Sequence, residues 1–360
     1  MLLQSSFSPT PILRNANIQT VLGGLGGRYL SLPPAVRTKM TANDGDVFFT
    51  DEWNQGAATT LILLPGLEGS PRSGYLRRLV RFLLATTSCG IMVVYSRGCT
   101  GIPNNQLRSY HSGFTEDLTQ LIAERNMSSL ILIGFSIGGN IVLKCLGELE
   151  GRAPHVRGAV AISTPCDLGR AAIAITRRPT YQRYFINSFQ RKHQRKVRAG
   201  IAPADYAIFQ GITTFWDYDN RFTAPLFGYD SPEAYWEHNS SRHYLARITV
   251  PTHLIIAEDD PFFCPLCIPR MECDTLPLVS LEVPQFGGHV GFLSSFTSQP
   301  YVDHLILRKV EEFQRGSSPK EAADTGLLQS RSPAGPSESE TAPSHLPEPS
   351  SVSSQAGKHS

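Results

Sequence analysis

The sequence is poor in cysteine, in charge bias and in long hydrophobic runs, and each shortage excludes a class of protein. Seven cysteines are spread thinly over 360 residues, which excludes a disulfide scaffold of the small secreted kind. The formal net charge is +2, so no overall electrostatic field favours nucleic acid or strongly acidic partners. No window approaches the roughly 18 uninterrupted apolar residues of a membrane-spanning helix.

Targeting and metal-binding signals are also scarce. The N-terminus lacks the basic start and the apolar run of a secretory signal peptide. We therefore expect a cytoplasmic protein, or one that touches a membrane only at its surface. Cys264 and Cys267 form a C-x-x-C with Cys273 nearby, but a structural zinc site needs a fourth ligand and usually a second pair. Ordinary thiols and no metal are expected there.

What the sequence does contain is an alternation of short apolar runs with amphipathic stretches. The strand-like runs span residues 60–64, 91–95, 130–133, 156–163, 252–257 and 279–283. The helix-like stretches span residues 75–85, 114–124, 137–146 and 301–313. This alternation predicts the α/β class, with a mostly parallel, doubly wound sheet covered by helices on both faces.

The alternation stops between Thr164 and Ile248, where helical pieces and an aromatic-rich stretch take its place. An insertion between strands of an open α/β sheet lies over the carboxyl ends of the strands, where such proteins keep their sites. We expect residues 165–248 to form a helical cap or lid within a domain of residues 1–315. Residues 316–360 are rich in Ser, Pro, Glu and Ala, which predicts a disordered tail.

The sharpest motif is Gly134-Phe135-Ser136-Ile137-Gly138. It fits the G-x-S-x-G nucleophile elbow, because an apolar strand is predicted before it and a helix after it. The turn of such an elbow is so tight that small residues must flank the serine, and Gly134 and Gly138 supply that room. Ser136 is therefore the predicted nucleophile.

A serine hydroxyl needs a base, and the base needs a carboxylate that orients it. In this fold the chain order is serine, acid, histidine. The strand predicted at residues 252–257 runs into Glu258-Asp259-Asp260-Pro261, where Asp260 is the preferred acid and Asp259 the alternative. His289 is the predicted base, because it lies in a glycine-rich loop just after the last predicted strand.

The tetrahedral intermediate of acyl transfer needs two backbone donors. One is expected from the N–H of Ile137, directly after the nucleophile. The other is expected from the loop after residues 60–64, where Leu67 is the preferred donor. This chemistry requires neither a metal nor an organic cofactor.

Taken together, these motifs resemble the YheT-like family of α/β hydrolases over about residues 7–315. The matching stretches are residues 13–15, 19–20, 65–69, 96–101, 110–113, 134–140, 215–229, 259–262 and 287–292. The resemblance implies a catalytic triad of Ser136, Asp260 and His289, and hydrolysis of carboxylic esters, either acyl lipids or short acyl esters. The chain departs from the family at Asn17 and Pro65, where histidine is usual.

Several alternatives stay open at the level of sequence. Acyl transfer to an alcohol uses the same residues, and a catalytically silent scaffold is a third reading. The spacing from His111 to Glu116 resembles an H-x-x-x-x-acid acyltransferase box whose usual aspartate falls one residue late, at Asp117. Residues 177–198 hold eight Lys/Arg and no acid, which suits a lid helix or a peripheral contact with an anionic membrane. No nucleic-acid module accompanies this charge, and the sequence does not specify an oligomeric state.

Overall fold

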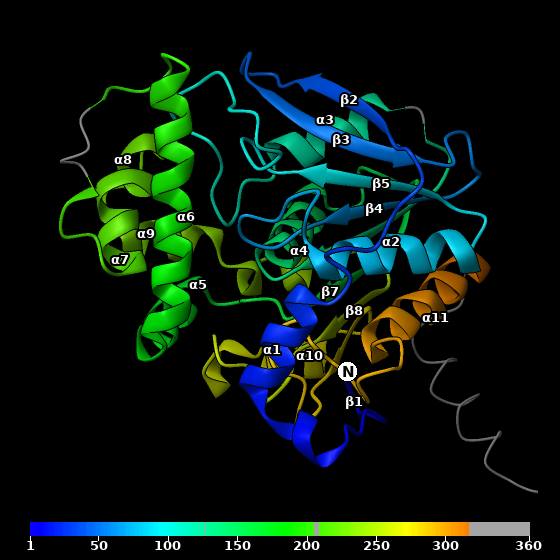
Figure 1. Cartoon of the computed structure of the whole chain (residues 1–360). Coiled ribbons are helices and arrows are strands. Elements are labelled where there is room, and N and C mark those ends of the chain that lie inside the picture. The colour runs from blue at the N-terminus through cyan, green and yellow to red at the C-terminus, as the bar shows by residue number, and fades with distance from the viewer. Residues whose placement is uncertain (126, 205–208, 317–360) are drawn as a thin grey trace, which may run out of the picture. The chain divides into compact units, whose positions relative to one another are not determined.

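The computed structural model describes residues 1–125, 127–204 and 209–316, so the predicted disordered tail lies outside the described residues except for Gly316. The described chain is centred on a sheet whose strands run in the order β1-β9-β8-β7-β6-β4-β5-β3-β2 (Figure 1). The strands are β1 (Leu2–Leu3), β2 (Val36–Thr41), β3 (Val47–Trp53), β4 (Thr60–Leu64), β5 (Gly90–Tyr95), β6 (Leu130–Phe135), β7 (Val156–Ile162), β8 (Thr252–Ile255) and β9 (Val279–Glu282).

Most neighbouring strands of this sheet are parallel, as the alternating pattern predicts. Among the described strands, β3 alone runs opposite to the common direction, and it pairs antiparallel with both β2 and β5. The predicted α/β class with a mostly parallel sheet is thus confirmed. The sequence did not predict β1, β2 or β3. The β1 strand is two residues long, which is too short to show a period.

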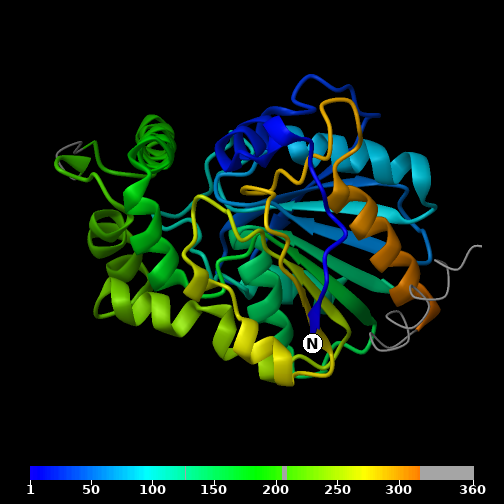
Figure 2. The ribbon, with the colours of Figure 1, turned by 90° about the horizontal axis from the view of Figure 1, so that it is seen from below.

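Both faces of the central strands are buried, and this explains why these strands read as unbroken apolar runs. In β4, Ile62 and Leu64 point into one apolar core, whereas Leu61 and Leu63 point into the other. Helices α2 (Gly74–Thr86) and α11 (Tyr301–Arg315) cover one face (Figure 2). Helices α3 (Glu116–Glu124), α4 (Ile137–Leu149) and α10 (Arg270–Thr275) cover the other.

The segment between β7 and β8, residues 163–251, is hereafter called the helical insertion. It contains α5 (Leu168–Ala174), α6 (Pro179–Arg198), α7 (Phe215–Tyr218), α8 (Ala224–Phe227) and α9 (Pro232–Asn239). These helices gather beyond the ends of the strands, on the side to which β4 and β5 point (Figure 1). Their own apolar cluster is largely aromatic and includes Phe189, Phe215 and Phe222.

One further helix, α1 (Ala16–Leu25), lies between β1 and β2 along the chain. The side chain of Asn15 caps it by accepting hydrogen bonds from the N–H groups of Asn17 and Ile18. None of the helices in the described part of the chain combines the length and the apolar composition that crossing a bilayer demands.

Candidate active site

Ser136 stands at a sharp turn between β6 and α4. Its φ of +53° lies in a region that residues with a side chain rarely adopt. The Ser136 N–H donates to the carbonyl of Ile162 (2.8 Å), and its own carbonyl accepts from the Gly139 N–H (2.9 Å). A Cβ on Gly134 would come within 2.5 Å of the Gly138 carbonyl oxygen, and one on Gly138 would collide with the carbonyl of Leu64. The turn therefore needs glycine at both positions.

Asp260 and His289 meet although they lie on different loops. Asp260 follows β8 and is buried, and its Oδ2 lies 2.8 Å from His289 Nδ1. Its other oxygen accepts the N–H of Phe262 (2.9 Å). Burial raises the pKa of Asp260, and the neighbouring His289 opposes that rise. The carboxylate thus holds the ring by Nδ1 and leaves Nε2 available.

The neighbouring acids have other contacts. Asp259 Oδ1 accepts the N–H of Gly288 (2.9 Å), so this carboxylate supports the loop rather than the imidazole. Burial raises the pKa of Asp259 to about 6. Glu258 is exposed and pairs with Arg270 (3.1 Å). Of the acids that follow β8, only Asp260 is hydrogen-bonded to His289 within the described residues.

An apolar cavity of about 90 Å³ brings Ser136 and the surroundings of His289 together. Phe262 and Phe263 line it with Ser136, and their rings lie 4.2 and 5.5 Å from the His289 ring. The remaining lining residues come mostly from the helical insertion and are Leu67, Ser112, Ile137, Pro165, Leu168, Ala171, Ala172, Ile175, Phe185, Phe215 and Trp236. No hydrogen bond joins Ser136 Oγ to His289 among the described residues, and His289 borders the cavity only through the rings of Phe262 and Phe263.

Backbone donors lie beside Ser136. The loop after β4 runs against the serine, since a Cβ on Gly66 would lie 3.6 Å from Ser136 Oγ. Its Gly66 and Glu68 N–H groups donate to the hydroxyls of Tyr75 and Tyr110 (3.0 Å each). The N–H groups of Leu67 and Ile137 have no protein acceptor within the part of the chain that the structure describes. Both remain available to a ligand in the cavity.

Sequence reasoning gave no role to α1, which supports the loop of His289. The Thr20 hydroxyl accepts the His289 N–H (2.9 Å). The buried Gln19 side chain bridges the carbonyls of Leu13 (2.7 Å) and Leu293 (2.9 Å) and accepts the Leu293 N–H (2.8 Å). The only sequence signal was the family-like stretch at residues 19–20, because a contact across 269 residues has no local pattern.

The structure does not assemble the acyltransferase box suggested by the spacing after His111. His111 is buried among aromatic rings, including those of Phe114 and Phe227, and burial lowers its pKa to about 3. Asp117 instead forms two hydrogen bonds to Arg97 (2.6 and 2.9 Å). Glu116 is an exposed residue at the start of α3.

A second, larger cavity of about 340 Å³ lies between the helical insertion and the core domain. It shares Leu67, Ser112 and Phe215 with the first cavity. Its lining mixes aromatic rings with charged groups such as Lys192 and Asp219. The site therefore combines a small apolar space at Ser136 with a wider space of mixed polarity next to it.

The cysteines remain free thiols. Cys264 and Cys267 bring their sulfurs to 3.3 Å, and burial raises the pKa of Cys267. No cluster of three or more His, Cys, Asp or Glu side chains suited to a metal ion occurs within residues 1–125, 127–204 and 209–316.

Comparison with known proteins agrees with this fold. A family model described as the alpha/beta hydrolase fold matches residues 59–296. The chain is 33% identical over 309 residues to YheT of Escherichia coli (strain K12), a protein named for an expected esterase activity. This match covers 82% of this chain and 89% of YheT. The chain is 25% identical over 329 residues to the human monoacylglycerol lipase ABHD2, which covers 82% of this chain and 76% of the relative.

Among solved structures, the esterase Pf2001 of Pyrococcus furiosus has the same fold, with a TM-score of 0.50 at 17% identity over 87% of this chain and 98% of that one. The fold and its relatives define an α/β hydrolase of the esterase and lipase type. Within that class, the chain belongs to the YheT-like family, as the motif resemblance indicated.

Proposed function

We propose that the protein is a serine carboxylic-ester hydrolase whose triad is Ser136, His289 and Asp260. The observation that carries the proposal is the 2.8 Å contact between Asp260 and His289 beside the cavity that contains Ser136. The strained backbone of Ser136 supports it, because such strain is typical of the nucleophile elbow.

Each step uses atoms of this chain. Because Asp260 occupies Nδ1, His289 takes the Ser136 proton at Nε2 while Ser136 Oγ attacks the ester carbonyl. The N–H groups of Leu67 and Ile137 then donate to the oxyanion. His289 returns the proton to the leaving alcohol, and water releases the acid from the acyl-enzyme by the same route.

The lining of the smaller cavity indicates the substrate class. Its walls are apolar apart from Ser112 and Ser136, so an acyl chain is favoured next to the nucleophile. A lipid ester or an ester of a short or medium-chain acid fits this description. The relatives include proteins named as monoacylglycerol lipases, which supports a lipid substrate.

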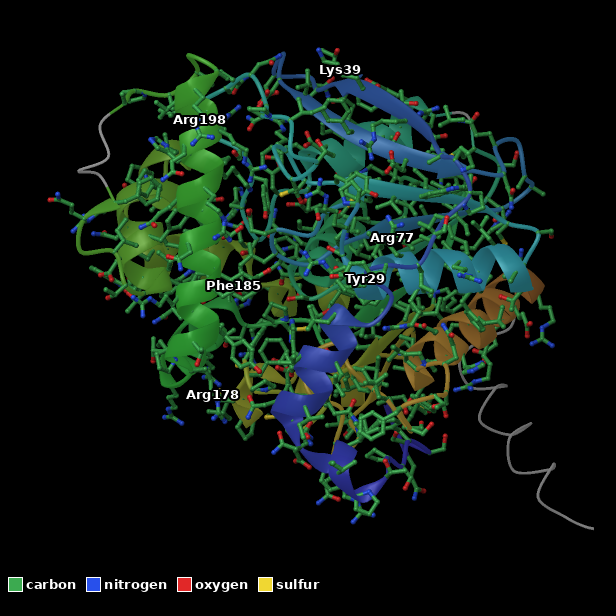
Figure 3. All side chains as sticks on the ribbon, viewed as in Figure 1. Tyr29, Lys39, Arg77, Arg178, Phe185 and Arg198 are labelled. Atoms are coloured by element: carbon green, nitrogen blue, oxygen red, sulfur yellow. The ribbon has the colours of Figure 1, made fainter. Side chains whose placement is uncertain are left out.

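The helical insertion supplies a second property. Arg183, Arg191 and Arg198 lie on the exposed side of α6, together with Tyr184, which is 62% exposed. Arg178 and Arg198 mark the two ends of this helix, with Phe185 between them (Figure 3). We infer that residues 177–198 make a peripheral contact with anionic lipid surfaces, because exposed arginines flanking an aromatic residue favour the interface.

Labelling with a fluorophosphonate tests the nucleophile. The wild-type protein should label and should hydrolyse p-nitrophenyl esters, and Ser136→Ala should lose both reactions while remaining folded. Ser128→Ala, at an exposed serine, is the matched control and should behave as wild type. Full activity in Ser136→Ala would remove the proposed mechanism.

The same assay separates the alternative reactions. Product analysis with an ester and ethanol should give mainly the free acid, whereas an excess of ethyl ester would identify an acyltransferase instead. A folded wild-type protein that neither labels nor turns over esters would be a silent scaffold.

A further inference from the structure

We propose that Glu68 is a positioning residue that aims the Leu67 N–H at the oxyanion, and that helix α6 of the helical insertion holds Glu68 in place through Lys192 and Ser188. The inference rests on the proposed hydrolase function. It adds that the oxyanion donor depends on the insertion, and not only on the sheet.

The carboxylate of Glu68 is buried in a cluster of donors. It accepts hydrogen bonds from the hydroxyls of Tyr110 (3.0 Å) and Ser188 (2.9 Å). It also forms an ion pair with Lys192, and about nine-tenths of each side chain of this pair is buried. Lys192 lies 4.4 Å from the centre of the Tyr110 ring. Two of these partners, Ser188 and Lys192, belong to α6.

The backbone of Glu68 depends on the same contacts. Its φ is +58°, a left-handed conformation that a residue with a side chain adopts only when its surroundings enforce it. Its N–H donates to Tyr110 Oη (3.0 Å), while that hydroxyl donates to its carboxylate. Tyr110 and α6 thus fix Glu68 at its backbone N–H and at its carboxylate. They thereby fix the Leu67–Glu68 peptide, which is adjacent to the Gly66–Leu67 peptide that carries the Leu67 N–H.

The ion pair keeps its charges despite burial. Burial disfavours the carboxylate, but Lys192 and the surrounding hydroxyls lower the pKa of Glu68 below its ordinary value. Burial also disfavours the ammonium group, whereas Cys99 and Glu68 raise the pKa of Lys192. Separating opposite charges inside a protein is unfavourable. Moving α6 away from the core would therefore disturb the oxyanion loop, which is the loop after β4 that carries Leu67 and Glu68.

The consequence is a link between the insertion and the rate of the chemical step. A donor that acts on the developing oxyanion stabilises the transition state more than the bound substrate. Loss of the Glu68 contacts should therefore lower kcat and leave KM nearly unchanged. A residue that served only packing or substrate binding would change stability or KM instead.

Steady-state kinetics on a water-soluble p-nitrophenyl ester tests this. In Glu68→Gln, Ser188→Ala and the double variant Glu68→Gln/Lys192→Met, kcat should fall, by about 10- to 100-fold in the double variant, with KM changed less than about 3-fold. The affinity for a boronic acid analogue of the transition state should fall in parallel. Lys192→Arg, which keeps the charge, should lower kcat less than the double variant does.

The double variant guards against misfolding, because it removes both charges and leaves no unpaired carboxylate. Lys309→Met is the control, since it breaks an ion pair to Glu312 on α11 (2.7 Å), far from the oxyanion loop. Wild-type kcat and analogue affinity in the folded double variant would overturn the positioning role, as would an effect confined to KM. An active Ser136→Ala protein would instead overturn the proposed hydrolase function, whatever Glu68 does.

Discussion

Two regions of the molecule hold the candidate site in different ways. The sheet and α1 fix Ser136 and the loop of His289 by close backbone approach, since Gly134, Gly138 and Gly23 leave no room for a Cβ. The helical insertion instead contacts the loop after β4 through side chains, among them the buried Lys192, which pairs with Glu68. A region set by backbone packing is sensitive to added volume, whereas one set by buried charges is sensitive to charge and pH.

The largest expected effect tests the sheet side. Asp260→Asn should lower kcat by about 10⁴-fold, because an amide no longer holds the required tautomer of His289. Asp259→Asn, whose carboxylate contacts only loop backbone, should lower kcat less than about tenfold. Steady-state kinetics on both folded variants measures the contrast. A larger loss in Asp259→Asn would reassign the triad acid.

The next prediction concerns the helical insertion and the dependence of protein stability on pH. Asp219 is buried and accepts hydrogen bonds from Thr223 (2.6 Å) and Trp236 (2.8 Å). Burial raises its pKa from 3.8 to about 6, so the folded state binds this proton more tightly than the unfolded state. The contribution of the protonated Asp219 carboxyl group to the stability of the folded state is full below about pH 4 and is lost as pH rises through about 6.

Asp219→Asn should remove this dependence. The difference in free energy of unfolding between Asp219→Asn and wild type should rise in favour of the variant by up to about 3 kcal/mol from pH 4 to pH 8. Urea denaturation at each pH measures this difference. Asp230→Asn is the control, because Asp230 is an exposed residue of the same insertion and carries no burial cost. Parallel curves for wild type and Asp219→Asn would contradict the prediction.

A smaller effect comes from two adjacent glycines of α1. A Cβ on Gly23 would lie 2.6 Å from Gly291 Cα in the His289 loop, whereas one on Gly24 meets nothing within 4 Å. Gly23→Ala should destabilise the protein by about 1–3 kcal/mol. Gly24→Ala should be neutral or stabilise it by about 0.5–1 kcal/mol. Equal unfolding midpoints of Gly23→Ala and Gly24→Ala in urea would show that α1 does not pack tightly against the His289 loop.

The smallest effect concerns the outer face of α6. Arg183→Gln/Arg191→Gln should bind vesicles containing phosphatidylserine about 30-fold more weakly, since each basic residue near such a surface contributes about 1 kcal/mol. The control Arg81→Gln/Arg157→Gln removes two exposed arginines of α2 and β7 and should bind as wild type. Co-sedimentation at low salt measures both, and equal binding would remove the membrane contact.

Periodicity and turn chemistry predicted much of the fold. The spacing of Leu76, Leu79, Val80, Leu83 and Leu84 indicated a one-sided helix. All of them are buried in α2 except Leu84, which is partly buried. The hairpin of β2 and β3 and the helix α1 were missed. Much of β2 is exposed, and α1 owes its role to contacts with a loop near the other end of the chain.

The sequence by itself determined the strands β4 to β9, the helices α2, α3, α4 and α11, and the candidate nucleophile, because apolar periodicity and a glycine-flanked serine act through neighbours along the chain. Only the tertiary structure decided which acid reaches His289, that Thr20 supports its loop, and that Glu68 meets Lys192. Those contacts join residues far apart in the chain, so their geometry exists only once the sheet and the helical insertion have assembled.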